Sequence, residues 1–287
     1  MWIVFAFGSA VAAGVTAVLA KIGIKNIGSN AATAIRTIVI LIFAWLMVLV
    51  TGSWKTAGDI TGHTMLFLVL SGVATGASWL CYFKALQLGD VNKVAPIEKS
   101  STVLTMILAI IFLGESITWL KLLCMLLIGV GTYLMIEKKE DISLKNNGSW
   151  KWLFYAGMSA VFASLTSILG KIGITDIDSN LGTAIRTVVV LVMAWVVVFA
   201  TGEQKDIKGI GKKSGLFLIM SGITTGISWL CYYRALQTGP ASIVVPIDKL
   251  SILITVFFSW AVLKEKLWAK SILGLIMITA GTLLLLK

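Results

Sequence analysis

The first half of the chain is repeated in its second half, and this duplication limits the possible folds more than any other feature. Residues 1–137 align without a gap on residues 151–287, and 58 of the 137 aligned pairs are identical. The identities include the polar or helix-breaking pairs Arg36/Arg186, Gln87/Gln237, Pro96/Pro246 and Lys99/Lys249. Chance similarity between apolar stretches would not preserve such residues at a constant offset. The chain therefore contains two copies of one structural unit.

Each copy divides into five apolar segments, and each segment has about the 20 residues that a helix needs to cross ~30 Å of hydrocarbon. In the first copy the segments lie near residues 2–20, 31–50, 65–87, 92–113 and 119–136. In the second copy they lie near residues 152–170, 181–200, 215–237, 242–263 and 269–286. Residues 138–150 form a polar linker between the copies. This pattern predicts an all-α integral membrane protein with ten transmembrane helices.

The composition agrees with a membrane protein. Only 13% of the residues are charged, whereas 58% are hydrophobic. A soluble domain carries about 25% charged residues, because it must cover its surface with them. The net charge of +11 does not indicate a nucleic-acid binder, since the basic residues gather in short loops and form no stripe interleaved with aromatic side chains. We expect a multi-pass protein of the cell membrane, plasma or inner, with no nucleic-acid partner.

The number of crossings predicts how the two copies are oriented. A unit that crosses the bilayer five times ends on the side opposite its start, so the second unit begins on that far side and is inverted. Such inverted repeats are a recurring architecture of transporters. Fourteen loop lysines fall on one side and four on the other. Because positive loops stay in the cytoplasm, both termini are predicted to lie outside it, and the first helix, which lacks signal-peptide features, is expected to be retained.

The sequence offers no catalytic or metal-binding motif. The three cysteines, Cys81, Cys124 and Cys231, lie inside apolar segments without the spacing of metal ligands. The single histidine, His63, has no HExxH motif around it, and the chain contains no nucleotide-binding motif. We therefore expect no enzymatic activity, no cofactor, no metal ion and no direct use of ATP.

Several short motifs recur in both copies and carry a family resemblance. Each third segment ends in Tyr-x-Lys/Arg-Ala-Leu-Gln, at residues 82–87 and 232–237. Each fourth segment contains Val-x-Pro-Ile-Glu/Asp-Lys, at residues 94–99 and 244–249, and a glutamate follows it as Glu115 or Glu265. Across nearly the whole chain this pattern resembles the EamA repeats of the drug/metabolite transporter superfamily.

The resemblance implies a fold and an activity. It implies ten helices around a central cavity and secondary transport, often export of amino acids or related metabolites. Two features of the chain differ from many ten-helix members. Their termini commonly lie in the cytoplasm, whereas the loop charges here favour the opposite, and the two halves here are as alike as the short single-repeat members that assemble in pairs.

Eight ionisable residues lie within or near the ends of the predicted helices, namely Arg36, Lys84, Glu98, Lys99, Arg186, Arg234, Asp248 and Lys249. A charge at the bilayer centre costs about 2.5–3.5 kcal/mol on insertion scales, so such residues usually have a partner or a function. The 14-residue separation between Lys84 and Glu98, and between Arg234 and Asp248, would let each pair meet across two antiparallel helices. We predict coupling or gating roles for six of them (Glu98, Asp248, Lys84, Arg234, Lys99 and Lys249), with the two acids as proton acceptors. The alternative is that these side chains anchor helices at the interface.

The predicted helices contain six cations and only two anions, which suggests that an anionic or zwitterionic substrate balances the excess. Candidate substrate-binding residues are the two arginines and the repeat-matched aromatic residues, that is Arg36, Arg186, Trp79, Tyr82, Trp229 and Tyr232. The alternatives are that the cations reach lipid headgroups and that the aromatic residues settle at the membrane interface.

Proline and glycine pairs also recur in the two copies. Pro96 and Pro246 precede the carboxylates by two residues, where each either breaks its helix or lies harmlessly in its first turn. The pairs Gly72/Gly76 and Gly222/Gly226 have the small-xxx-small spacing that permits close helix packing.

These observations predict a secondary active transporter that works by alternating access. The expected cargo is a small metabolite such as an amino acid or organic anion, the expected direction is export, and proton coupling is an option. We expect contacts with membrane lipids and leave open whether the protein is a monomer or a homo-oligomer. The alternatives are a flippase for a lipid-linked substrate and a membrane scaffold that transports nothing.

Overall fold

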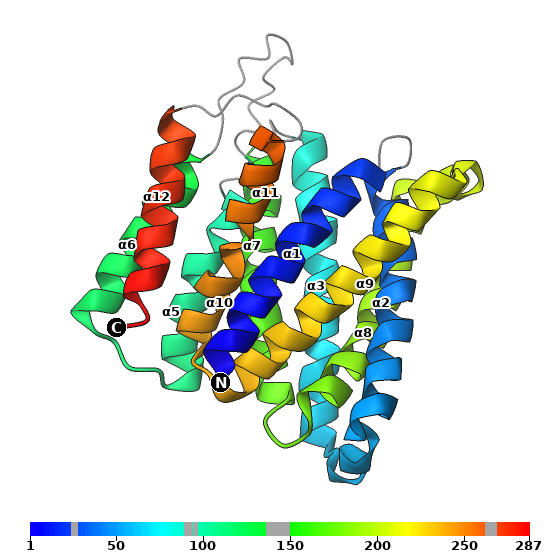
Figure 1. Ribbon diagram of the computed structural model, residues 1–287, viewed down its shortest axis with the longest axis horizontal. Helices are drawn as coiled ribbons and strands as arrows, with labels where there is room; N and C mark the ends of the chain where they lie inside the picture. Colours follow the sequence, from blue (N-terminus) through cyan, green and yellow to red (C-terminus); the bar gives the residue numbers. More distant parts are fainter. Residues whose placement is uncertain (24–27, 89–93, 95–96, 136–149, 262–268) are drawn as a thin grey trace.

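The computed structural model describes residues 1–23, 28–88, 94, 97–135, 150–261 and 269–287, and these residues form a bundle of α-helices (Figure 1). The helices of the first copy are α1 (Trp2–Gly23), α2 (Ser29–Thr51), α3 (Gly62–Leu88), α5 (Ser101–Leu113) and α6 (Trp119–Leu134). The helices of the second copy are α7 (Lys151–Gly173), α8 (Ser179–Thr201), α9 (Lys212–Thr238), α10 (Ala241–Lys249), α11 (Ser251–Ala261) and α12 (Ala269–Leu284). Two short 3-10 helices, η1 (Ser53–Asp59) and η2 (Glu203–Gly209), follow α2 and α8.

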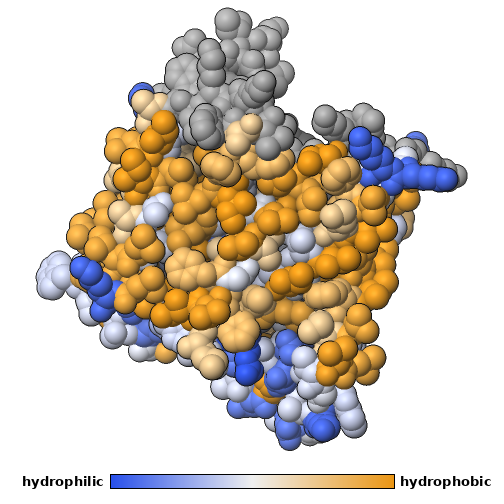
Figure 2. All heavy atoms as spheres, viewed as in Figure 1, coloured by the Kyte–Doolittle hydropathy of each residue, from blue (hydrophilic) through white to orange (hydrophobic). Residues whose placement is uncertain are grey.

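The helices have the length and exterior of a membrane protein. Within the described residues, seven helical stretches are long and apolar enough to cross a membrane, and α6 and α12 are shorter apolar helices. Large apolar side chains such as Leu49, Phe112 and Phe199 are exposed. Figure 2 shows apolar side chains across the middle of one face, with hydrophilic side chains below and at the upper right. An apolar exterior of this extent is costly in water, so the chain is a multi-pass membrane protein.

Helices of one copy pack mainly on helices of the other. α1 lies along α9, and α7 makes the matching contact with α3. α2 packs on its own counterpart α8, as α6 does on α12 at the other side of the bundle (Figure 1). This reciprocal pattern follows from the duplication, because a contact that a helix of the first copy makes with the second copy recurs with the two copies exchanged.

α2 and α8 run in opposite directions. Ala34, near the start of α2, clusters with Ala194 and Val198, near the end of α8. Val48, near the end of α2, clusters with Leu181, near the start of α8. This antiparallel pairing fixes which residue of α8 lies at the same height as a given residue of α2, including the two arginines.

The repeated glycines lie where helices approach closely, as the small-xxx-small spacing predicted. A Cβ atom on Gly72 would lie 2.7 Å from Cβ of Val189 on α8, and one on Gly222 would lie 2.7 Å from Cβ of Val39 on α2. A Cβ atom on Gly131 would lie 2.7 Å from the carbonyl oxygen of Gly274, where α6 meets α12. Packing at these positions leaves no space for a larger residue.

The fourth segment of the second copy is not one continuous helix, which corrects the prediction for residues 242–263. The helix is interrupted at Leu250, between α10 and α11. Pro246 lies inside α10 rather than at the interruption, while Pro96 lies outside the described residues. α10 begins against Glu115, whose carboxylate accepts hydrogen bonds from the backbone N–H groups of Ala241 (2.6 Å) and Ser242 (3.1 Å). Glu115 thus caps a helix that belongs to the other copy.

Candidate functional site

A cavity of about 600 Å³ lies between helices of both copies. Its ionisable lining residues are Arg36, Glu98, Lys99, Arg186, Asp248 and Lys249. Its aromatic lining residues are Trp79, Tyr82, Trp229, Tyr232 and Tyr233. The structure therefore brings ten residues of the predicted site together around one space, and adds Tyr233. Their roles in coupling, gating or substrate binding stay predictions.

Arg186 is the most enclosed charge of the cavity. Only 3% of its surface is exposed. Nε donates to Oγ of Ser71 at 2.9 Å, and Nη2 donates to Oγ1 of Thr75 at 2.6 Å. Cζ lies 5.2 Å from the ring centroid of Trp229 and 4.9 Å from that of Tyr233. Hydroxyl groups and ring faces thus replace part of the hydration of the guanidinium group, but the described residues provide no partner for Nη1.

Arg36 occupies the matching place in the other copy, with fewer contacts. Its Nη2 donates to Oγ1 of Thr225 at 2.8 Å, and its Nε is buried without a hydrogen-bond partner in the described part of the chain. Arg36 as a whole is only partly buried. Each arginine is therefore held by a threonine of the other copy and keeps a buried N–H group without a partner.

The two carboxylates of the cavity have different surroundings. Oδ1 of Asp248 accepts a hydrogen bond of 2.5 Å from Oγ of Ser9. Oε2 of Glu98 lies 3.3 Å from Nζ of Lys99, whose side chain is half exposed. One acid of the cavity is therefore bonded to a hydroxyl group and the other is paired with a cation.

Two predicted gating residues lie elsewhere. The predicted pair of Arg234 and Asp248 is wrong, because Nη1 of Arg234 lies 3.8 Å from Oδ2 of Asp178 and also donates to Gln237. Arg234 lies near the end of α9, outside the cavity lining. Lys84 is exposed near the end of α3 and does not line the cavity either. Its pairing with Glu98 stays a prediction.

Sequence reasoning missed a set of hydroxyl groups that joins the two copies at the cavity. Ser78 on α3 donates to the carbonyl oxygen of Ser159 on α7, and Ser228 on α9 donates to that of Ser9 on α1. Ser71 donates to the carbonyl oxygen of Thr166 at 2.7 Å. These residues recur at the 150-residue offset within apolar segments, and that recurrence was the signal that could have identified them.

The cavity reaches one end of the α2–α8 pair and not the other. Asn30 and Thr33, in the first turns of α2, line it, whereas the matching residues of α8, Asn180 and Thr183, do not. Thr33 is partly exposed and Thr183 is 1% exposed. We call the start of α2, which the cavity reaches, the α2 end, and the start of α8, which it does not reach, the α8 end.

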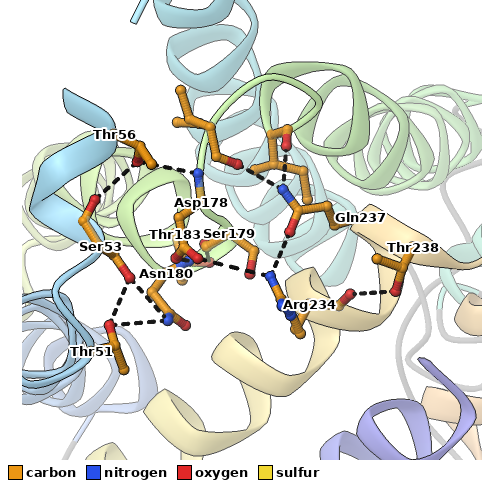
Figure 3. A network of polar contacts seen from close by, with 12 residues as sticks. Thr51, Ser53, Thr56, Asp178, Ser179, Asn180, Thr183, Arg234, Gln237 and Thr238 are labelled. Atoms are coloured by element: carbon orange, nitrogen blue, oxygen red, sulfur yellow. Dashed lines mark hydrogen bonds and ion pairs between the residues drawn. The ribbon is translucent and has the colours of Figure 1, made fainter. Parts of the chain in front are cut away.

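Polar contacts cover the α8 end (Figure 3). Nε2 of Gln237, near the end of α9, donates to the carbonyl oxygens of Ile174 and Ile177, at 2.7 Å each. Asp178 precedes α8, and its side chain accepts from the backbone N–H of Asn180 at 2.8 Å as an N-cap. The backbone N–H of Asp178 donates to Oγ1 of Thr56 in η1 at 3.3 Å. These bonds fasten the start of α8 to α9 and to η1.

A second contact covers the α8 end beside α10. Nζ of Lys171, at the end of α7, donates to the carbonyl oxygen of Gly239 at 2.5 Å and lies 3.8 Å from Oε1 of Glu115. Glu115 in turn caps α10, as described above. The counterpart of Glu115 is Glu265, which lies outside the described residues.

The fold and the cavity define a class of protein, namely a multi-pass membrane protein with a polar chamber between two like halves. The profile of the EamA-like transporter family matches residues 1–137 and again residues 150–287. The chain therefore belongs to the EamA-like transporter family, and it is a membrane transporter.

Two proteins of known sequence resemble single stretches of the chain. One is a Sinorhizobium protein described as an uncharacterized transporter, which is 47% identical over 134 residues, or 47% of this chain and 95% of that protein. The other is an uncharacterized protein of Methanocaldococcus jannaschii, which is 34% identical over 100 residues, or 32% of this chain and 73% of that protein. The Sinorhizobium protein thus corresponds in extent to about one copy of the repeat.

A solved crystal structure has the same fold. It aligns with a TM-score of 0.80 over 99% of this chain and 97% of its own, at 14% sequence identity. At this identity the likeness concerns the arrangement of helices alone.

Proposed function

We propose that the protein is a secondary active transporter that exports a small metabolite, such as an amino acid or organic anion, by alternating access. The observation that carries this proposal is the cavity between the two copies. Both copies supply it with an arginine, a carboxylate, a lysine and aromatic residues. A charged chamber inside apolar helices is costly, and a passing solute gives it a function.

The proposed architecture is ten transmembrane helices in two inverted repeats. The duplication, the antiparallel course of α2 and α8, and the reciprocal packing of α1 on α9 and α7 on α3 support this arrangement. Two inverted halves around a shared site allow each half to take the conformation of the other, which moves the opening to the opposite face. By the loop charges, the α2 end faces the cytoplasm and both termini lie outside it.

Glu98 and Asp248 are the proposed proton carriers if transport is proton-coupled. They line the cavity from matching positions of the two copies. Lys99 and Lys249 are charged neighbours that help to hold or release each carboxylate. The proposed partners are a small solute, protons and membrane lipids, with the protein acting as a monomer or homo-oligomer.

Reconstitution into proteoliposomes tests this function. Uptake of water-soluble metabolites is measured with and without a pH gradient for the unchanged protein, for Glu98→Gln and for Asp248→Asn. Asp176→Asn is the matched control, since Asp176 is exposed outside the cavity. We expect gradient-driven accumulation to be lost in the first two variants and kept in the control.

Other outcomes distinguish the alternatives. Gradient-driven accumulation that persists in both cavity variants would remove the two carboxylates from coupling. Movement of a fluorescent lipid without flux of any soluble solute would replace the proposal with a flippase, and the absence of both activities would indicate a scaffold.

A further inference from the structure

The two cavity arginines have a geometry that selects one chemical class of solute. We infer that they bind a carboxylate group, so that the substrate of the proposed transporter is an organic carboxylate. This inference rests on the proposed function and deepens it, because it assigns the ligand of the cavity from the donors that the protein leaves unused.

The first support is the unused donor on each guanidinium group. Nη1 of Arg186 and Nε of Arg36 are both buried and lack a hydrogen-bond partner among the described residues. A buried donor without a partner costs about 1–3 kcal/mol, and more on a charged group. Nε and Nη2 of Arg186 each donate to a hydroxyl group, of Ser71 and Thr75, so the orientation of the guanidinium group, and with it that of Nη1, is fixed.

The second support is the charge of the chamber. Four cations and two carboxylates line it. A cationic solute would add to the excess positive charge, whereas an anion would reduce it. Arginine also presents planar N–H pairs that match a carboxylate, and such charge-assisted hydrogen bonds are roughly twice as strong as neutral ones.

The third support is the position of the two arginines along the α2–α8 pair. Ala34 lies beside Ala194, and Val48 lies beside Leu181. This register puts Arg36 and Arg186 about six to seven residues apart in level, or about 10 Å at 1.5 Å per residue. One arginine therefore serves each half of the chamber, and both belong to the same cavity lining.

Ring faces complete the site on one side. Trp229 and Tyr233 flank the guanidinium group of Arg186, while Trp79 and Tyr82 line the cavity from the other copy. Such surfaces accept the carbon chain of an organic acid, since binding sites for small molecules combine apolar walls with a few fixed polar groups.

Binding to the purified unchanged protein is the decisive measurement. Short-chain mono- and dicarboxylates are titrated beside the amides and amines of the same carbon chains, and tryptophan fluorescence and calorimetry report binding. Of the eleven tryptophans in the chain, Trp79 and Trp229 line the cavity, and a ligand bound there is expected to change their contribution to the fluorescence. We expect carboxylates to bind and the matched amides and amines to fail. Binding of the amides or amines with equal affinity, or of phosphate esters alone, would overturn the inference.

Variants then locate the site. Arg186→Gln and Arg36→Gln are each expected to weaken carboxylate binding by about 10- to 100-fold, the loss that follows from removing a hydrogen bond to a charged group. Lys55→Gln is the control, since Lys55 is exposed in η1, outside the cavity. Because Arg186 is so buried, Arg186→Lys is included as a charge-retaining variant and is expected to bind more weakly than the unchanged protein. Unchanged affinity in both glutamine variants would contradict the assignment.

Failure of this inference can be told apart from failure of the transport function. If neutral or cationic solutes cross proteoliposomes while carboxylates neither bind nor move, the carboxylate site is wrong and transport stands. If carboxylates bind at the arginines and no solute moves, the site stands and transport is wrong.

Discussion

The α2 end and the α8 end are built from matching residues and yet differ in burial and in their contacts. At the α8 end, Ser179, Thr183 and Arg186 are almost fully buried. At the α2 end, the matching Ser29, Thr33 and Arg36 are partly or fully exposed. A duplicated sequence therefore adopts two conformations within one molecule. Substitutions that followed the duplication, such as Gly28 in place of Asp178 and Ser53 in place of Glu203, show where the two ends are no longer equivalent.

The largest expected effect comes from a matched pair of cysteines. Thr33→Cys and Thr183→Cys are made singly after Cys81, Cys124 and Cys231 are replaced, and the purified protein is labelled with a polar maleimide. Minor conformations are commonly populated at about 0.1–10%, so the cysteine at position 183 should react about 10- to 1,000-fold more slowly than the one at 33. Both threonines donate to a backbone carbonyl one turn earlier, which makes the exchange comparable. Equal rates would mean that the two ends do not differ in solution.

The next effect concerns the stability of the α2 end. The carboxylate of Glu203 accepts from the backbone N–H groups of Asn30 (2.9 Å) and Ala31 (3.1 Å) and from Nδ2 of Asn30 (2.5 Å). Its counterpart Ser53 receives one longer bond from Asn180, of 3.3 Å. Glu203→Ala should lower the free energy of unfolding by about 2–3 kcal/mol, since charge-assisted bonds at a helix N-terminus are lost. Ser53→Ala should cost about 0.5–1 kcal/mol.

Denaturation in mixed micelles, followed by circular dichroism, measures both changes. Glu203→Gln is the intermediate control, because it keeps an acceptor oxygen without the charge. A loss no greater for Glu203→Ala than for Ser53→Ala would show that this carboxylate does not distinguish the two ends.

The smallest effect comes from making the α8 end resemble the α2 end. Asp178→Gly removes the N-cap of α8 and the ion pair with Arg234, and a lost cap costs about 1 kcal/mol. If that loss falls on the covered conformation alone, labelling of the cysteine at position 183 should accelerate about fivefold. Arg234→Lys introduces the residue of the other copy and should change the rate less than about twofold, since exposed pairs contribute about 0–1 kcal/mol. A slower labelling rate in Asp178→Gly would contradict the role of the Asp178 contacts in covering the α8 end.

The sequence predicted the charged residues of the cavity well because a charge inside an apolar segment is costly and therefore conspicuous. Arg36, Glu98 and Asp248 are charged residues in apolar segments, and the duplication marked them twice. The family assignment and the membrane class followed from the same pattern. The glycine contacts were also predictable, because small residues at the small-xxx-small spacing lie on one helix face and allow another helix to approach closely.

Contacts between the copies could not be predicted from spacing alone. The 14-residue separation placed Arg234 opposite Asp248, but the side chain turns to Asp178, which lies in a loop that the repeat pattern did not position. Glu203 similarly binds the start of α2, far away in the sequence. Such choices depend on how one copy is placed against the other, and a one-dimensional spacing does not contain that placement. The interruption at Leu250 was missed because no helix-breaking residue occupies it.

The crosswise packing of α1 on α9 and of α3 on α7 has a consequence for the independence of the halves. The serine-bearing helix faces of each copy pack against the other copy, so neither half has a complete interior of its own. A half-length version of this protein would expose those faces to lipid unless a second molecule packed against them. Severing the connection between the halves should therefore leave two pieces that reassociate, whereas expressing one piece alone should yield either a self-paired assembly or degradation.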